Sequence, residues 1–148
     1  MPTTGRCLCG NIRYSFKGEP LWVAHCHCES CRRETSSAVA TFVGVRTDKL
    51  TYTSGTPAVY HSTPGVDRSF CPRCGAPIAY ACEAHFPGEM HLYIGTLDDP
   101  IGIAPAFHVH TGEQLHWFEI LDGLPRCTAS GSGAKPAGHG PSVASRLS

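Results

Sequence analysis

The chain has 148 residues, of which 41% are hydrophobic and 16% are charged, so it is long enough to bury a core of its own. Twelve basic residues balance twelve acidic ones, and the resulting net charge of zero argues against nucleic acid as the main partner. No apolar run approaches the length of a membrane span, and residues 1–6 lack the apolar segment of a signal peptide. We therefore expect a globular protein that acts in the cytoplasm, without a membrane partner.

Short runs rich in β-forming residues recur along the chain, separated by Gly-containing and Pro-containing turns such as 17–20, 54–57, 63–65 and 97–100. We predict strands at 11–16, 21–25, 39–45, 50–53, 58–61, 77–80, 91–94, 106–109 and 115–118. Helical periodicity is sparse, and one short helix is predicted over 30–35 with Ser30 as its cap. The pattern predicts a mainly β fold of small, packed antiparallel sheets with minimal helix.

The composition changes after Cys127. Residues 128–148 consist mostly of Ser, Gly, Ala and Pro, with too few large apolar side chains to offset the entropy lost on ordering. We expect one zinc-binding domain over residues 1–127 and a low-complexity, disordered tail over 128–148.

The nine cysteines are the most informative feature of the composition. Their odd number and the missing signal segment argue against a secreted disulfide scaffold. Seven of them stand at metal-ligand spacings, in the segments Cys7-Leu-Cys9, Cys26-His-Cys28-Glu-Ser-Cys31 and Cys71-Pro-Arg-Cys74. Zinc suits clustered thiolates in a reducing compartment. Cys82 and Cys127 match no ligand spacing and are expected to be ordinary thiols.

Cys71-Pro-Arg-Cys74-Gly75 has the form of a zinc knuckle, in which two thiolates three residues apart bind one metal and the glycine lets the backbone fold back. A structural zinc takes four ligands. Because residues i and i+2 share a face of an extended segment, Cys7 and Cys9 can supply the other pair. We predict a closed, structural zinc site at Cys7, Cys9, Cys71 and Cys74.

Cys26, Cys28 and Cys31 supply three more thiolates, which leaves one tetrahedral position for another ligand. Three thiolates on Zn²⁺ carry a net charge of about −1, so this zinc is a poorer Lewis acid than one held by neutral imidazoles. It is better suited to holding a fourth thiolate as a nucleophile. The cluster therefore predicts an open second zinc site, two zinc ions per chain, and sulfur chemistry rather than hydrolysis.

An alternative is that a histidine completes the second site and makes it structural as well. His25 and His27 alternate with Cys26 and Cys28 and are expected to point to the opposite face. The other candidates, which no spacing distinguishes, are His61, His85, His91, His108, His110 and His116.

Together these segments resemble the glutathione-dependent formaldehyde-activating enzyme (GFA) family, which includes centromere protein V. The resemblance spans about residues 5–126 and rests on the segments 7–14, 25–33, 70–75, 95–100 and 117–125. It implies a β-tent fold, a structural zinc at the positions of Cys7, Cys9, Cys71 and Cys74, and a second zinc at those of Cys26, Cys28 and Cys31. The namesake activity, grouped with the carbon–sulfur lyases, joins formaldehyde to glutathione as S-hydroxymethylglutathione.

The leading hypothesis from the sequence is a zinc-dependent carbon–sulfur lyase or thiol-adduct synthase. Its partners would be a small thiol such as glutathione and a small aldehyde, with Arg32 and Arg33 placed to hold a carboxylate of the thiol substrate. The alternative is a non-catalytic zinc-binding module that docks a protein or thiol ligand. A chromatin role, suggested by the centromeric relatives, conflicts with the zero net charge.

Overall fold

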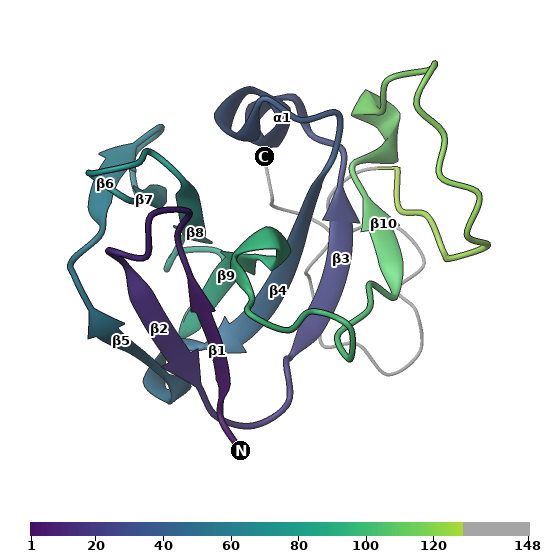
Figure 1. The fold of residues 1–148 in the computed structure, drawn as a ribbon. Helices are drawn as coiled ribbons and strands as arrows, with labels where there is room; N and C mark the ends of the chain where they lie inside the picture. The colour runs from purple at the N-terminus through teal and green to yellow at the C-terminus, as the bar shows by residue number, and fades with distance from the viewer. Residues whose placement is uncertain (129–148) are drawn as a thin grey trace. The chain divides into compact units, whose positions relative to one another are not determined.

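The computed structural model describes residues 1–128 and is mainly β, with one α-helix (Figure 1). These residues fall into two compact units that interleave in sequence. The first unit comprises Met1–Leu21 and Val43–Ile103, and the second comprises Trp22–Phe42 and the described part of Ala104–Ser148. The single zinc-binding domain over 1–127 stays a prediction. The predicted tail over 128–148 lies, from residue 129 onward, outside the described residues.

The first unit contains a three-stranded antiparallel sheet in the order β1-β2-β5, formed by β1 (Thr3–Arg6), β2 (Arg13–Phe16) and β5 (Leu50–Ser54). Gly5 of β1 pairs with Tyr14 of β2. A Cβ at Gly5 would lie 2.3 Å from the Tyr14 ring, whose hydroxyl is 2.6 Å from Thr96 Oγ1. The strand therefore carries glycine where the tyrosine ring crosses it.

A second run of neighbouring strands in this unit has the order β4-β9-β8-β7-β6. The strands are β4 (Ala40–Arg46), β6 (Ala58–His61), β7 (Asp67–Phe70), β8 (Pro77–Ala81) and β9 (Glu89–Tyr93). The pairs β6–β7, β7–β8 and β8–β9 are antiparallel. Two 3₁₀ turns, η1 (Thr47–Lys49) and η2 (Ile94–Thr96), complete the unit. Its core includes Ile12, Phe16, Ile78, Tyr80 and Leu92.

The second unit holds β3 (Trp22–Cys26), the start of β4, α1 (Glu29–Thr35), β10 (Phe107–Val109) and the 3₁₀ turn η3 (Thr111–Glu113). The strand order is β10-β3-β4. β10 and β3 are parallel, with His108 opposite His25 and Val109 opposite Cys26 (Figure 1). The sequence predicted antiparallel sheets, so this pair is a departure. A parallel pair is possible here because β3 and β10 are joined by a long stretch of chain and not by a hairpin.

The sequence-based strand assignment is confirmed for eight of the nine predicted segments, with end positions that differ by up to two residues. The prediction of a strand at 115–118 is wrong, because Phe118 N–H donates to Leu115 O at 2.9 Å and closes a turn there. β1 and β7 were missed, since Thr3–Arg6 and Asp67–Phe70 are short and rich in polar residues.

The short helix begins one residue earlier than predicted, and Ser30 is not its cap. Cys28 is the N-cap, and its Sγ accepts a hydrogen bond from Cys31 N–H at 3.2 Å. The sequence suggested Ser30 because serine is the usual cap, whereas here a thiol takes that role.

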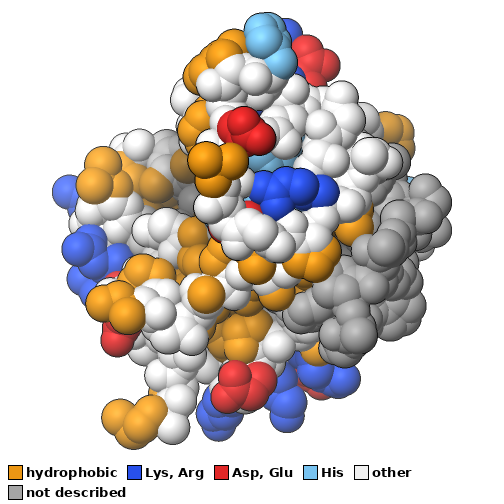
Figure 2. Space-filling view, turned by 90° about the vertical axis from the view of Figure 1, so that its right-hand side faces the viewer, with side chains coloured by type: hydrophobic (Ala, Val, Ile, Leu, Met, Phe, Trp, Pro, Cys, Tyr) orange, Lys and Arg blue, Asp and Glu red, His pale blue; other side chains and the backbone are white. Residues whose placement is uncertain are grey.

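The described residues contain no helix with the length and apolar character needed to cross a bilayer. On the face drawn in Figure 2, the described charged side chains stand in small separate groups among hydrophobic and uncharged ones. This distribution agrees with the balanced charge of the sequence.

Candidate metal centres

The first cysteine cluster lies within the first unit and brings together Cys7, Cys9, Cys71 and Cys74, whose sulfurs all lie within 4.8 Å of one another. The Sγ atoms of Cys7 and Cys9 are 3.6 Å apart, and those of Cys9 and Cys71 are 3.8 Å apart. A tetrahedral zinc with Zn–S bonds of about 2.3 Å separates its sulfurs by about 3.8 Å. The four thiols therefore have the spacing that one zinc ion requires.

Two turns position these sulfurs. Gly75 N–H donates to Cys71 O at 2.8 Å with φ at +78°, as the knuckle motif predicts. Cys71 Sγ also accepts the N–H groups of Arg73 and Cys74 at 3.3 and 3.4 Å. Cys7 and Cys9, however, do not share the face of a strand. They lie in a turn after β1, closed by Gly10 N–H donating to Cys7 O at 3.2 Å.

The electrostatics of this cluster favour a bound cation. Burial opposes ionisation of Cys71, but hydrogen bonds from the Cys74 and Arg73 N–H groups lower its pKa overall. The Asn11 N–H acts to lower the pKa of Cys9, yet burial and the other thiols raise it to about 11. Without a counter-charge, each thiolate therefore disfavours the ionisation of its neighbours. A divalent cation among the sulfurs removes this repulsion.

The second cluster lies within the second unit and consists of Cys26, Cys28 and Cys31, with sulfurs within 4.8 Å of one another. Cys26 ends β3, Cys28 caps α1 and Cys31 lies in its first turn. The Sγ atoms of Cys26 and Cys31 are 3.7 Å apart, again the edge of a zinc–thiolate tetrahedron. All three side chains are fully buried.

The three thiols of this second cluster differ in their readiness to ionise. Burial raises the pKa of Cys26 well above its ordinary value. Hydrogen bonds with Cys26 and Cys31 lower the pKa of Cys28 to about 3, and the field of His110 contributes to the same shift. One thiolate thus forms readily, whereas further ionisation in this buried place requires a cation. The donor set fits zinc, and among residues 1–128 no fourth Cys, His, Asp or Glu belongs to this group.

Arg32 and Arg33, the predicted carboxylate-binding residues, line a cavity of about 280 Å³ together with Glu29. The Arg33 guanidinium forms an exposed ion pair with Glu29 Oε1 at 3.0 Å. Arg32 Nε is buried and has no hydrogen-bond partner. Arg32 therefore keeps one donor without a hydrogen-bond partner, whereas the Arg33 guanidinium is already paired with Glu29.

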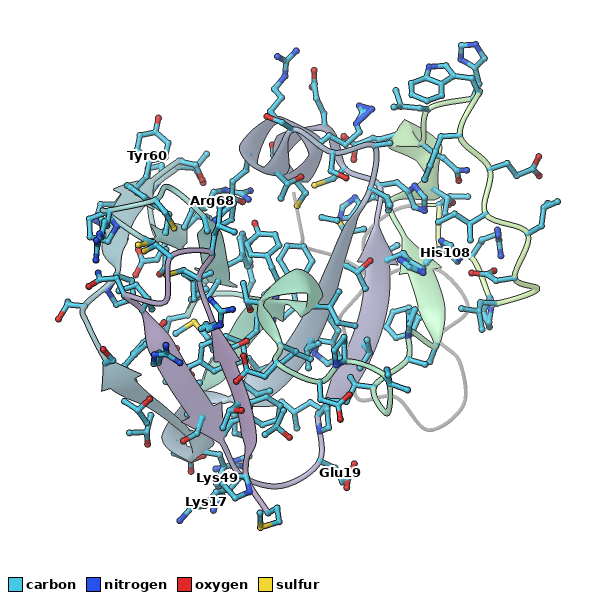
Figure 3. All side chains as sticks on the ribbon, viewed as in Figure 1. Lys17, Glu19, Lys49, Tyr60, Arg68 and His108 are labelled. Atoms are coloured by element: carbon cyan, nitrogen blue, oxygen red, sulfur yellow. The ribbon has the colours of Figure 1, made fainter. Side chains whose placement is uncertain are left out.

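A third cluster, which the sequence analysis missed, lies in the second unit and consists of His25, His108 and Asp122. Figure 3 labels His108 on β10. Its Nε2 is 2.8 Å from Asp122 Oδ2, and its Nδ1 is 2.9 Å from His27 Nε2. The parallel pairing of β10 with β3 places His108 beside His25. The alternation of His25 and His27 with cysteines was visible in the sequence, but not this pairing.

Burial is the main influence on these imidazoles. It lowers the pKa of His25, and it lowers that of His27 to about 4. Both rings are therefore neutral near pH 7, with a lone pair available. Burial acts to raise the pKa of Asp122, but hydrogen bonds from Leu124 N–H, His108 and Arg126 hold it below its usual range, so this residue is a carboxylate.

Comparison with known proteins supplies the family. A sequence profile of the glutathione-dependent formaldehyde-activating enzyme family matches residues 2–113 of the 148. The chain belongs to this family. The recognition from its cysteine segments is thereby confirmed, and its two cysteine clusters have an arrangement that could hold metal ions.

Among solved structures, the chain is similar to a Rhodobacter sphaeroides protein determined by crystallography as a structural genomics target. The TM-score is 0.55 at 22% sequence identity, over 69% of this chain and 91% of the other. This likeness shows the fold alone. No curated protein matches the chain.

Proposed function

We propose that the protein is a zinc-dependent carbon–sulfur lyase, or thiol-adduct synthase, that joins glutathione to formaldehyde as S-hydroxymethylglutathione in the cytoplasm. Cys7, Cys9, Cys71 and Cys74 would hold a structural zinc, and Cys26, Cys28 and Cys31 a second zinc. The main support is the second cluster, with three sulfurs at zinc–thiolate spacing and no fourth protein ligand grouped with them in residues 1–128. Membership of the GFA family agrees with this chemistry.

When bound, the second zinc stabilises the thiolate form of a substrate thiol at neutral pH. The reaction forms one carbon–sulfur bond. The thiol loses its proton, the sulfur lone pair adds to the aldehyde carbon, and the carbonyl π electrons move to oxygen, which takes up a proton. Cys26, Cys28 and Cys31 hold the centre, and their burial excludes bulk water from it.

Substrate binding would rest on Arg32, with Arg33 contributing if its ion pair with Glu29 opens. Arg32 Nε has no hydrogen-bond partner, and Arg32 lines a cavity of about 280 Å³ that has room for a carboxylate. Replacing Arg32 should therefore raise the KM for glutathione more than replacing Arg33, by about tenfold for a charge-assisted hydrogen bond of about 1.5 kcal/mol.

The test is calorimetric binding of glutathione and S-methylglutathione to the zinc-loaded protein, followed by a magnetisation-transfer NMR assay of adduct formation from glutathione and formaldehyde. The proposal expects binding of glutathione with release of a proton, weak binding of the methylated analogue, and faster adduct exchange than without protein. Cys28→Ser should abolish both effects. Cys127→Ser, which changes another buried thiol of the same unit, should preserve them.

A non-catalytic zinc module is the second candidate, and one observation favours it. All three sulfurs of the second cluster are fully buried, which is typical of a structural site. If the protein is a non-catalytic zinc module, glutathione and its S-methyl derivative should bind equally, and adduct formation should proceed at the rate without protein.

A further inference from the structure

The cluster of His25, His108 and Asp122 differs from both cysteine clusters in its ligand atoms, since it offers two imidazoles and a carboxylate. One donor atom from each of the three residues lies within 4.8 Å of the other two. The rings of His25 and His108 are 4.8 Å apart between centroids, with an interplanar angle of 34°. Neither a hydrophobic contact nor an ion pair requires two imidazoles and a carboxylate to converge in this way.

Each member also has a hydrogen-bond partner outside the cluster. His108 Nδ1 is held by His27 Nε2 at 2.9 Å, and His25 Nδ1 by Thr41 Oγ1 at 2.7 Å. Asp122 Oδ1 accepts from Leu124 N–H at 3.0 Å and from Arg126 at 3.1 Å. Metal-binding histidines and carboxylates have this arrangement, in which a second partner orients each ligand.

We propose that His25 Nε2, His108 Nε2 and Asp122 Oδ2 form a third metal site, which takes a divalent first-row transition ion. A proton now lies between His108 Nε2 and Asp122 Oδ2, which are 2.8 Å apart. The ion replaces that proton, which is released. With metal–ligand bonds of about 2.0–2.2 Å the two atoms need only separate by about half an ångström.

The donor set distinguishes this site from the cysteine sites. Two neutral imidazoles and one carboxylate leave a net charge of about +1 on a divalent ion, whereas three thiolates leave about −1. The remaining positions would therefore take oxygen ligands such as water or a carbonyl group. The Asp122 side chain is 23% exposed, which provides an approach from solvent. The inference does not depend on the proposed function.

The test uses the full chain with its cysteine sites loaded with zinc and excess metal removed. Co²⁺ is then added and followed by absorption and calorimetry, since it binds such sites more weakly than zinc and does not displace zinc from thiolates. We expect one further equivalent of Co²⁺, with d–d bands of nitrogen and oxygen ligation and no thiolate charge-transfer band.

Asp122→Asn and His25→Ala should each weaken this binding at least tenfold. The control is His61→Ala, which removes an exposed histidine paired with Asp67 at 2.8 Å in the first unit, and should leave the affinity unchanged. Zinc content and the melting transition, measured for every variant, show whether the fold is intact. If Asp122→Asn unfolds the protein, the Co²⁺ affinity of the His25→Ala protein is the deciding measurement.

The proposal is overturned if no further equivalent of Co²⁺ binds. It is also overturned if folded His25→Ala protein binds as tightly as the parent chain, or if His61→Ala weakens binding equally. None of these results would bear on the thiolate sites, whose occupancy is read separately from the retained zinc.

Discussion

At the scale of single residues, the sites depend on backbone geometry as much as on ligand chemistry. Gly75 has a φ of +78°, and a Cβ there would meet nothing within 4 Å. Its role in the knuckle is therefore conformational and not a matter of space. A residue with a side chain at this position is therefore disfavoured only by the left-handed backbone conformation and not by a steric clash.

Gly75→Ala should lower the free energy of unfolding by about 1–2 kcal/mol, the cost of placing an L-residue in the left-handed region. Gly95→Ala is the matched control, because Gly95 also has open space around its Cβ position but no positive φ. It should change stability by less than about 1 kcal/mol. Denaturant unfolding of both variants at fixed free zinc makes the comparison, and equal effects would contradict the conformational role.

Another residue-scale prediction concerns His91, which is fully buried beside Tyr80 and Phe86. Burial lowers its pKa in the folded protein. Below about pH 6.5 the unfolded chain therefore binds more protons at this residue than the native chain, and stability falls as the pH falls. Since glutamine does not titrate, the stability difference between the parent chain and His91→Gln should shrink between about pH 7 and pH 5. A difference independent of pH would contradict the buried neutral imidazole.

At the scale of elements, two strands without a hairpin between them define the second unit. β3 ends in Cys26, β10 lies parallel to it, and His27 N–H donates to Val109 O at 3.1 Å beyond the paired residues. This pairing brings the residues after β10 next to the segment that carries Cys26 and Cys28. The position of the second cluster thus depends on a long-range contact, which local sequence patterns do not contain.

The pairing of β1 with β2 allows a prediction about Gly5, which lies against the Tyr14 ring. In Gly5→Ala the added Cβ would overlap the Tyr14 ring at 2.3 Å and the Thr96 carbonyl at 2.7 Å. Because Tyr14 is buried and bonded to Thr96, the ring has little freedom to move, and overpacking typically costs about 1–3 kcal/mol. The melting temperature of Gly5→Ala should therefore fall well below that of Gly95→Ala. A melting temperature equal to that of the parent chain would show that the strands can separate without cost.

The sequence predicted most of the fold and both cysteine clusters, because Cys-rich spacings and β-rich runs are local signals. The Cys71-Pro-Arg-Cys74 knuckle is an example, since its turn is encoded within five residues. The strand at 115–118 was wrong and the parallel β3–β10 pair was missed, because pairing partners distant in sequence leave no local trace. The same reason hid the cluster of His25, His108 and Asp122.

At the scale of the whole molecule, each compact unit contains one complete cysteine cluster. A cysteine substitution in one cluster should therefore affect the unit that contains that cluster and not the other unit. Cys71→Ser should unfold the first unit, because binding of a structural zinc contributes about 10–16 kcal/mol to folding. Cys28→Ser should retain a folded first unit and lose about one zinc per chain. Zinc content and hydrogen exchange by mass spectrometry distinguish the two outcomes, and unfolding of the first unit in Cys28→Ser would contradict this division.

Cys26, Cys28 and Cys31 are proposed to form a three-thiolate metal site whose fourth position accepts a substrate thiol. The most direct measurement is ¹¹³Cd NMR of the cadmium-substituted protein, because the cadmium shift reports the number of sulfur ligands at each site. Among the resonances of sulfur-ligated cadmium we predict two, one typical of four thiolates and one of three. Glutathione should move only the second into the four-thiolate range, and S-methylglutathione should move neither. Two four-thiolate resonances without added thiol, or a three-thiolate resonance that glutathione leaves unchanged, would contradict the account.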